Sequence, residues 1–266
     1  MSEERLGFDN VPEIYDRARP SYPAALFEDL LTYLDAPPGQ VVRAVEIGPG
    51  TGKATASLLE RSVEVTAVEI GVNLAAFLRK KLPDERLTVI NAAYEDIALE
   101  PASYDLVVSA TAFHWVDPAV RLRKSHEALR AAGAIAIIET NQIASDADRG
   151  FFKPMHQIIL KHSPGEKWDD PPSDDVTPAI YDELLASELF AGVELRRYRW
   201  DQTYSTAQYA DLTRSFGGTQ AMEHDAAESM VAEICDLVDR EFGGSVTRPL
   251  VMTLTLGRKR SDDSSA

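Results

Sequence analysis

The sequence predicts an α/β fold in which helices cover both faces of a doubly wound, mostly parallel sheet. Apolar segments rich in β-branched residues alternate with amphipathic segments between residues 41 and 140, which is the order that a parallel sheet with crossover helices requires. A glycine-rich turn ends the first apolar segment, and a glutamate ends the second. Over the whole chain, the pattern of segments predicts seven strands, a helical cap before them and an insertion after strand five.

Each element before the insertion is expected from its own residues. In the cap, residues 8–34, Pro20 ends a short helix over 12–19, and Pro23 starts a second helix that runs to residue 34. A Pro-Pro-Gly loop then leads to the sheet. The strands are expected at 42–47, 63–69, 87–91, 106–110 and 134–139, and the helices between them at 52–61, 72–81 and 118–131.

The alternation stops after residue 140, and residues 143–190 are expected to form an insertion that contains Trp168 and a polar, proline-rich loop. It would emerge at the carboxyl ends of the strands, where ligands of open α/β sheets bind. It is therefore expected to be either a lid over a substrate or a simple surface loop. A strand over 193–204, helices within 206–242 and a last strand over 249–256 complete a single domain of residues 1–257, and residues 258–266 are expected to be a disordered tail.

Composition excludes several classes of protein. The chain has 266 residues, a formal net charge of −16 and a pI near 4.7, so its surface repels phosphate backbones and anionic membranes. No apolar run approaches the roughly 20 residues that span a bilayer, and the first ten residues are too acidic for a secretory signal. A single cysteine, Cys235, excludes an internal disulfide framework. We expect a cytoplasmic protein that binds neither nucleic acid nor membranes.

The glycine-rich turn reads Val45-Glu46-Ile47-Gly48-Pro49-Gly50-Thr51-Gly52. Glycine at 48 and 50 leaves the main chain open to close approach by a ligand and permits a positive φ. A strand, such a turn and the start of a helix are the usual parts of a nucleotide-cofactor site. Glu46 would repel a pyrophosphate, so the turn favours a cationic cofactor that carries an ammonium or a sulfonium group. An ordinary tight turn is the alternative.

Glu69 ends the second strand, 17 residues after Gly52. An acidic residue at this place, about 20 residues past the glycines, is positioned to accept hydrogen bonds from both hydroxyls of a ribose. The alternative is an ordinary solvated glutamate. The agreement of the loop, helix and strand spacings favours the ribose.

With these residues the chain resembles the class I S-adenosylmethionine-dependent methyltransferases, and among them the small-molecule branch related to trans-aconitate and ubiquinone-pathway methyltransferases. The resemblance rests on residues 46–52, Glu69, 94–96, 104–108 and 113–115, and it covers about residues 8 to 140. It implies a Rossmann-like sheet whose last strand runs antiparallel. It also implies S-adenosylmethionine as the cofactor, bound by the half of the chain over residues 41–140.

The resemblance further implies an adenine site at Tyr94 and Glu95, after the third strand, with Ile70 as its other wall. Many relatives have an aspartate shortly before this point, where this chain has two alanines. Glu95 or Asp96 would then have to replace the contact to the adenine amine. Packing at the surface is the alternative for Tyr94.

At the methionine end of the cofactor, the main chain near Gly48 and Ala110, with Glu46 to orient it, would receive the ammonium group. The carboxylate needs a cation, and a guanidinium binds a carboxylate bidentately. The cap offers Arg19, with Tyr15 as its helper, although arginines on a cap helix commonly face water. The expected cofactor ligands are Tyr15, Arg19, Glu46, Gly48, Pro49, Gly50, Thr51, Glu69, Ile70, Tyr94, Glu95 and Ala110.

Phe113, His114 and Trp115 follow the fourth strand, which in this architecture places them beside the methyl group that is transferred. Together with Trp168 they are expected to line the substrate site. His114, with an ordinary pKa near 6.5, suits a general base for a hydroxyl or a protonated amine, whereas a carboxylate acceptor needs no base. A pocket wall and a purely structural role are the alternatives for His114.

The sequence thus predicts a methyltransferase that acts on a small molecule, with oxygen favoured over nitrogen and carbon as the acceptor atom. Methylation of a protein or an RNA is one alternative, and a non-catalytic protein that binds S-adenosylmethionine is another. No Cys/His cluster has the spacing of metal ligands, so no metal is expected. The chain is expected to be a monomer or a homodimer, and the identity of the acceptor stays open.

Overall fold

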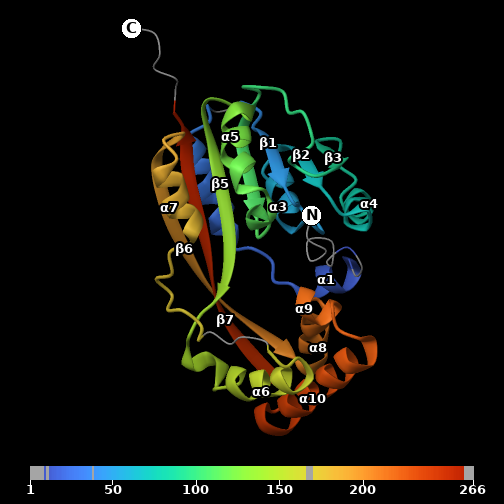
Figure 1. The fold of residues 1–266 in the computed structure, drawn as a ribbon. Helices are drawn as coiled ribbons and strands as arrows, with labels where there is room; N and C mark the ends of the chain where they lie inside the picture. The colour runs from blue at the N-terminus through green and yellow to red at the C-terminus, as the bar shows by residue number, and fades with distance from the viewer. Residues whose placement is uncertain (1–8, 10–11, 38, 166–169, 261–266) are drawn as a thin grey trace. The chain divides into compact units, whose positions relative to one another are not determined.

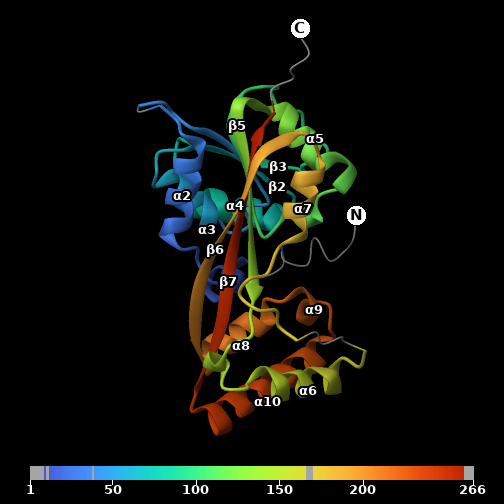
Figure 2. The ribbon, with the colours of Figure 1, turned by 90° about the vertical axis from the view of Figure 1, so that its left-hand side faces the viewer.

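The computed structural model describes residue 9 and residues 12–37, 39–165 and 170–260. By its internal contacts the chain forms two compact units, each of which is described by itself (Figure 1, Figure 2). The sheet unit comprises residues 21–140, 177–198 and 252–266, and the helical unit comprises residues 1–20, 141–176 and 199–251. The chain crosses between the units several times, so three long strands begin in one unit and end in the other.

A parallel sheet forms the centre of the sheet unit (Figure 1). Its first five strands are β1 (Arg43–Ile47), β2 (Glu64–Glu69), β3 (Leu87–Asn91), β4 (Tyr104–Ala110) and β5 (Leu129–Gln142). β1 pairs in parallel with β2 and β4, β2 pairs with β3, and β4 pairs with β5. β7 (Ser245–Lys259) and β6 (Phe190–Ser205) complete a seven-stranded sheet in the order β3-β2-β1-β4-β5-β7-β6. The strand order therefore reverses between β1 and β4, which is where ligands bind in such sheets.

Helices cover both faces of this sheet. α2 (Ala24–Leu34) and α3 (Lys53–Leu59) lie on one side, and α5 (Pro118–Ala128) and α7 (Ala179–Ala186) lie on the other (Figure 2). α4 (Val72–Lys81) packs against β2 and β3. On the α5 and α7 side, the buried core joins Val107 and Ile137 of the strands to Leu184 of α7. Every residue of β4 is buried, as expected for a central strand between two helical layers.

The helical unit consists of α1 (Pro12–Ala18), α6 (Phe152–His162), α8 (Thr206–Arg214), α9 (Gly217–Gln220) and α10 (His224–Phe242), with the adjoining ends of β5, β6 and β7. α10 buries an apolar stripe that packs against α6 and α8, as expected for an amphipathic helix. Phe151 is buried edge-on against Tyr209 and Phe242, with ring centroids 5.0 Å and 5.2 Å apart. The helical unit therefore has an aromatic core of its own.

Most of the expected elements are confirmed within two residues, and β5 is the main exception. It was expected at 134–139 but extends from Leu129 to Gln142, and the helix before it ends at Ala128 instead of 131. The alanine-rich segment at 129–132 favours a helix by propensity. Pairing of Leu129 with Tyr104 draws it into the sheet instead, and Ala132 adopts a positive φ of 61°.

β7 also differs from its expected limits. It was expected over 249–256, yet the strand begins at Ser245 and ends at Lys259. Arg258 donates to the carbonyls of Tyr33 and Ala132, and Nζ of Lys259 donates to the carbonyl of Leu129 at 2.7 Å. The first residues of the expected tail are therefore part of the sheet, and residues 261–266 lie outside the described residues.

The expected cap and the expected insertion each fall into both units. α1 belongs to the helical unit and α2 to the sheet unit. α6 belongs to the helical unit, whereas α7 belongs to the sheet unit and buries Ile180 and Leu184 in its core. The lid remains a prediction for the residues before α7. No helix in the described ranges is both long and apolar enough to cross a membrane.

Candidate functional site

The glycine-rich turn lies at the carboxyl end of β1, beside the reversal of strand order. Gly48, Gly50 and Gly52 have positive φ values of 63°, 56° and 82°, a conformation that glycine adopts without steric cost. The N–H of Gly48 donates to the carbonyl of Val68 at 2.9 Å and so ties the turn to β2. A Cβ added to Gly48 would lie 2.4 Å from the Cβ of Ala112, whereas one added to Gly50 would meet nothing within 4 Å. Gly48 is therefore required by packing, and Gly50 borders open space.

Glu46, at the end of β1, is buried with one carboxylate oxygen unsatisfied. Only 1% of the residue is exposed. Oγ1 of Thr55 in α3 donates to Oε2 at 2.6 Å, and Oε1 has no hydrogen-bond partner among the described residues. Burial raises the pKa of Glu46 to about 7; the charge of Glu69 adds to this shift, and the hydrogen bond from Thr55 opposes it. A cationic group next to Oε1 would satisfy this oxygen and stabilise the ionised acid.

Glu69, at the end of β2, holds two loops by their main chains. Its Oε2 accepts the N–H of Gly50 at 2.9 Å, and its Oε1 accepts the N–H of Gly71 at 2.8 Å. Asn91, at the end of β3, donates to the carbonyls of Glu69 and Ile70 at 2.8 Å and 3.1 Å. Glu69 is 4% exposed, so it is not an ordinary solvated glutamate. The structure brings Glu46, Gly50 and Glu69 together, as the sequence predicts.

Tyr94 is buried in the core, and packing at the surface is therefore wrong for it. It is 2% exposed, and its hydroxyl lies 3.1 Å from Oγ of Ser125 in α5. Burial raises the pKa of Tyr94 to about 12, with the Ser125 hydrogen bond opposing the shift. The carboxylate of Glu95 accepts the N–H of Asp117 at 3.1 Å. Because its ring serves the core, Tyr94 would contact a ligand through its main chain.

The three residues after β4 that were expected to line the substrate site do not all have the same environment. Phe113, His114 and Trp115 form a single 3₁₀ turn. Phe113 is buried in the core of the sheet unit, whereas His114 is exposed and Trp115 is half-buried. The rings of His114 and Trp115 lie 4.8 Å apart. His114 and Trp115 therefore remain available to a ligand, and Phe113 supports them from the core side.

Arg121 of α5 fixes this turn and sets the charge near His114. Its Nη1 donates to the carbonyl of Phe113 at 3.2 Å, and its Nε donates to Oε1 of Glu183 at 3.1 Å, with a second contact from Nη2 to the same carboxylate. Partial burial lowers the pKa of His114, and the charge of Arg121 lowers it further. His114 is therefore neutral at pH 7, which suits either a proton acceptor or a pocket wall.

Tyr15 and Arg19 belong to the helical unit. Nε and Nη2 of Arg19 donate to Oγ and to the carbonyl of Ser215, both at 3.0 Å. The guanidinium lies 5.0 Å from the ring centre of Tyr15 and 4.5 Å from that of Phe216. Tyr15 thus stacks on Arg19, as expected of a helper, and their contact with a cofactor stays a prediction. Trp168 lies outside the described residues.

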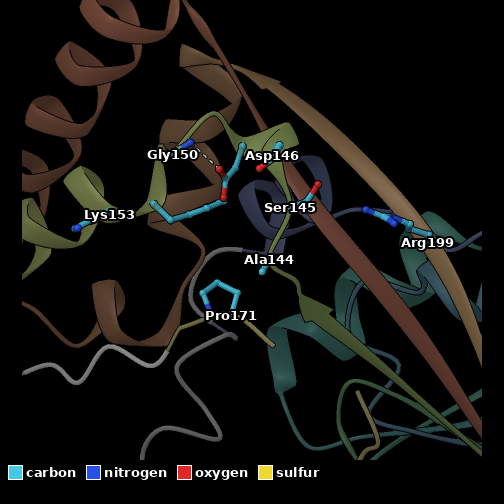
Figure 3. Close-up of a pocket in the computed structure, with 9 residues that line it drawn as sticks. Ala144, Ser145, Asp146, Gly150, Lys153, Pro171 and Arg199 are labelled. Atoms are coloured by element: carbon cyan, nitrogen blue, oxygen red, sulfur yellow. Dashed lines mark hydrogen bonds between the residues drawn. The ribbon is translucent and has the colours of Figure 1, made fainter. Parts of the chain in front are cut away.

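A hollow of about 620 Å³ lies within the helical unit (Figure 3). Figure 3 shows Lys153 and Arg199 on opposite sides of it, with the loop that carries Asp146 between them. The loop is held by a hydrogen bond of 2.7 Å from the N–H of Gly150 to the carboxylate of Asp148. Arg199 already forms an ion pair with Asp174 at 3.0 Å. Because acids and bases are mixed around this hollow, its charge favours no class of ligand.

Several residues of the site were not expected from the sequence. Thr55 follows Gly52 by three positions, so the sequence could have predicted a hydroxyl in the first turn of the next helix, near Glu46. The pair of Arg121 and Glu183 spans 62 positions, and no local pattern announces it. Glu139, at the end of β5, is half-buried; burial raises its pKa, and the charge of Arg121 opposes the shift. Within the described residues, no group of three or more His, Cys, Asp or Glu side chains could hold a metal ion.

Comparisons of sequence agree with this geometry. The family described as "Methyltransferase domain" matches residues 45–137, from β1 into β5. An uncharacterized methyltransferase of Mycobacterium tuberculosis (strain ATCC 25618 / H37Rv) is 30% identical over 210 residues, which cover 79% of this chain and 76% of that protein. The match therefore extends well beyond the glycine-rich turn.

Comparisons of structure find the same fold. A protein of Anaeromyxobacter dehalogenans, described as a "Putative Type II Methyltransferase", superposes with a TM-score of 0.62 at 21% identity, covering 91% of this chain and 97% of that one. Phosphoethanolamine N-methyltransferase 2 of Haemonchus contortus, solved with phosphomonomethylethanolamine and S-adenosylhomocysteine, superposes with a TM-score of 0.56 at 13% identity, covering 98% and 61%. At these identities the likeness concerns the fold alone.

Proposed function

Since the chain belongs to the class I S-adenosylmethionine-dependent methyltransferases, we propose that it methylates a small molecule, with oxygen favoured over nitrogen and carbon as the acceptor atom. One observation carries the choice of methyl donor. The unsatisfied, buried carboxylate of Glu46 lies at the end of the strand that leads into an open glycine turn at Gly50. That arrangement suits a ligand with a positive charge that approaches the main chain closely.

The residues present fit S-adenosylmethionine. Oε1 of Glu46 offers a negative partner for a cationic group, and the open space at Gly50 leaves room beside the main chain. Glu69, which already accepts two N–H groups, offers its carboxylate to the ribose hydroxyls. Arg19, with Tyr15, is proposed for the carboxylate of the cofactor. The remaining proposed contacts are Gly48, Pro49, Thr51, Ile70, Tyr94, Glu95 and Ala110.

The chemistry asks little of the protein beyond position. When bound, the cofactor supplies a methyl group on a positively charged sulfur. An acceptor atom with a lone pair would take this methyl group; an ammonium acceptor would have to lose a proton before it has that lone pair, and a hydroxyl acceptor would lose its proton on transfer. Alignment of the reacting atoms supplies most of the rate. We propose that neutral His114 accepts that proton or forms a wall of the site with Trp115; its lowered pKa and the 4.8 Å between the two rings support this.

Charge favours a small molecule over the macromolecular alternatives. With a net charge of −16, the protein would repel an RNA substrate at long range. A non-catalytic protein that merely binds the cofactor is the other alternative. The intact turn at 46–52 supports retained cofactor binding, and so do the two hydrogen bonds that the Glu69 carboxylate accepts from Gly50 and Gly71. Neither feature bears on methyl transfer.

Incubation with labelled S-adenosylmethionine and a fractionated cell extract tests this proposal. We expect label in small molecules, and none with Gly50→Val as a matched control. Label in protein or RNA alone would replace the small-molecule acceptor with a macromolecule. Binding of S-adenosylhomocysteine without any transfer of label would favour the non-catalytic alternative. The cytoplasmic location and the monomeric or dimeric state stay predictions.

A further inference from the structure

Arg248 is a half-buried cation of the helical unit with no acidic partner among the described residues. Its Nη2 donates to Oε1 of Gln142 at 2.7 Å. Its guanidinium lies 5.4 Å from the ring centre of Phe216 and 5.9 Å from that of Phe152. Nε is buried without a hydrogen bond, and Nη1, which has none either within the described part of the chain, is not buried. The guanidinium is therefore fixed in place with one end open.

Several other arginines of the helical unit have acidic partners, whereas Arg149 donates to the carbonyls of Phe242 and Ser245. The chain carries 43 acidic and 27 basic residues, so a shortage of carboxylates does not explain why Arg248 has no acidic partner among the described residues. A cation that is removed from water without a counter-charge destabilises the fold until a negative group supplies one. The paired arginines are Arg17 with Asp211 at 2.8 Å, Arg199 with Asp174 at 3.0 Å and Arg214 with Glu228 at 2.7 Å.

A second guanidinium adds to the positive charge at this place. Arg19 lies 4.5 Å from the ring centre of Phe216, the ring that Arg248 also contacts. Burial raises the pKa of Tyr204, and the charges of Arg248 and Arg19 both oppose that shift, so all three groups are neighbours. The hydroxyl of Tyr204, a residue that is 4% exposed, makes no hydrogen bond to any described residue. We call Arg19, Arg248, Tyr204 and Phe216 the arginine cluster.

We propose that the arginine cluster binds the oxyanion group, a carboxylate or a phosphate, of a small organic ligand. The open end of a guanidinium pairs with two oxygens of such a group, and Tyr204 adds a hydroxyl donor. The rings of Phe152 and Phe216 suit the apolar part of an organic acid. This oxyanion site stands independently of the proposed function.

Arg248 is the residue that distinguishes two sources of the oxyanion. The cofactor also carries a carboxylate, for which Arg19 is proposed. If Arg248 served that carboxylate, its loss would weaken S-adenosylhomocysteine. If it serves a separate oxyanion ligand, its loss leaves the affinity for S-adenosylhomocysteine unchanged and removes the response to simple oxyanions. Both measurements are made without methyl transfer, so failure of the proposed function is seen separately.

The test compares Arg248→Met with Arg199→Met, whose arginine is ion-paired and lines the hollow of Figure 3. Thermal unfolding is followed in succinate, in inorganic phosphate and in sodium chloride at equal ionic strength. We expect succinate or phosphate to raise the midpoint of the wild type and of Arg199→Met by a few degrees, and to leave Arg248→Met unchanged. Calorimetry should find S-adenosylhomocysteine bound to Arg248→Met within threefold of the wild type.

Two results would overturn the proposal. An equal response of all three proteins would show that no oxyanion binds at Arg248. A tenfold loss of affinity for S-adenosylhomocysteine in Arg248→Met would assign this guanidinium to the carboxylate of the cofactor. A larger response to succinate than to phosphate, lost in Arg248→Met, supports a carboxylate as the group, and the reverse supports a phosphate.

Gln142→Glu keeps the test decisive where Arg248→Met does not fold. Oε1 of Gln142 already accepts from Arg248 at 2.7 Å, so a glutamate there supplies the missing negative charge within the chain. We expect a higher unfolding midpoint without added anions and no response to succinate or phosphate. Gln157→Glu, at an exposed position of α6, is the control for the added charge. A lower midpoint, or an intact response in Gln142→Glu, would contradict the proposal.

Discussion

Two regions of the molecule bury charge that no described residue balances, and the two charges are opposite. At the glycine turn of the sheet unit, Glu46 keeps a carboxylate oxygen without a partner; in the helical unit, Arg248 keeps a buried Nε without one. Folded proteins pair buried charges because an unpaired one is costly. The opposite signs therefore point to ligand groups of opposite sign, a cationic group at the first region and an oxyanion at the second.

The regions also differ in how they carry this charge without a ligand. Glu46 is able to take up a proton, and because burial disfavours its charged form, its pKa rises to about 7. Arg248 cannot lose its proton under ordinary conditions, so it depends on the amide of Gln142 and on the rings of Phe216 and Phe152. Cofactor binding should therefore depend on pH near 7, whereas Arg248 itself adds no pH dependence to oxyanion binding.

The largest expected effect is the loss of cofactor binding in Gly50→Val. A Cβ at Gly50 enters open space, where the methionine part of the cofactor is proposed to lie, so affinity for S-adenosylhomocysteine should fall by more than about 100-fold, or about 2.7 kcal/mol. Calorimetry measures it. The response to succinate in the helical unit should stay unchanged, which would establish that the two regions bind separately.

Gly39→Val is the matched control for this change. Gly39 also has a positive φ, 81°, and a Cβ there also meets nothing within 4 Å, so both variants carry a similar backbone strain of about 1–2 kcal/mol. Gly39→Val should bind S-adenosylhomocysteine normally. Binding by Gly50→Val within threefold of the wild type would remove the turn from the cofactor site.

Glu69→Ala should have the next largest effect. Loss of hydrogen bonds to a charged group costs roughly 1.5–3 kcal/mol, so affinity for S-adenosylhomocysteine should fall by roughly 10- to 150-fold. An analogue without the two ribose hydroxyls should bind the variant and the wild type alike. Unequal weakening of that analogue would show that Glu69 acts on another part of the cofactor.

The same variant should also lose stability, because Glu69 holds the main chains of Gly50 and Gly71. Two N–H groups would then lose their acceptor, at roughly 1–3 kcal/mol, which urea unfolding measures. The sequence suggests a ribose ligand at this position but no structural role. A variant as stable as the wild type would mean that the two loops keep their shape without this carboxylate.

Glu46→Gln should stabilise the protein without cofactor, and only at higher pH. The pKa of Glu46 rises from an ordinary 4.5 to about 7 on folding, so the folded state keeps a proton that the unfolded state loses. Stability of the wild type therefore falls as pH rises from about 4.5 to about 7 and is level above. At pH 8 the variant should be more stable by roughly 1–3 kcal/mol, and below the unfolded-state pKa of 4.5 the difference should vanish.

Affinity for S-adenosylhomocysteine should respond in the opposite sense. A cationic group prefers ionised Glu46, so binding to the wild type should strengthen as pH rises towards 7 and release protons, which calorimetry in buffers of different ionisation heat detects. Glu46→Gln should bind about tenfold more weakly without this pH dependence. Glu64→Gln, at an exposed position of β2, is the control. An unchanged pH dependence in Glu46→Gln would mean that another group titrates.

The cofactor region was largely predictable from the sequence because its signals are local. The strand before Gly48, the glycine turn and the glutamate at the end of β2 lie within 27 residues, from Arg43 to Glu69. Hydrophobic alternation and turn chemistry determine each of these elements. Tyr94 is the exception: the sequence does not show that Ser125, 31 positions away, holds its hydroxyl in the core.

The arginine cluster was not predictable in the same way. Arg248 and Gln142 are separated by 106 positions, and Arg19 and Ser215 by 196. An arginine in a strand is usually expected to have an exposed side chain, and the position of Arg248 beside Phe216 and Phe152 arises only from tertiary packing. Local patterns in the sequence therefore located the region around Glu46 but not the region around Arg248.

His114→Asn is expected to have the smallest effect, a reduction of tenfold or less in the rate of transfer. Burial and Arg121 lower the pKa of His114, so it is neutral above about pH 6.5, and the wild-type rate should be level there. A general base would raise the rate of transfer by a factor of about 10²–10⁴. Alignment of the reacting atoms alone is enough to drive methyl transfer. His126→Asn, on α5 with Nε2 3.3 Å from the carbonyl of Arg260, is the matched control. A thousandfold loss of turnover with unchanged cofactor affinity would instead make His114 the base and the acceptor a hydroxyl or an amine.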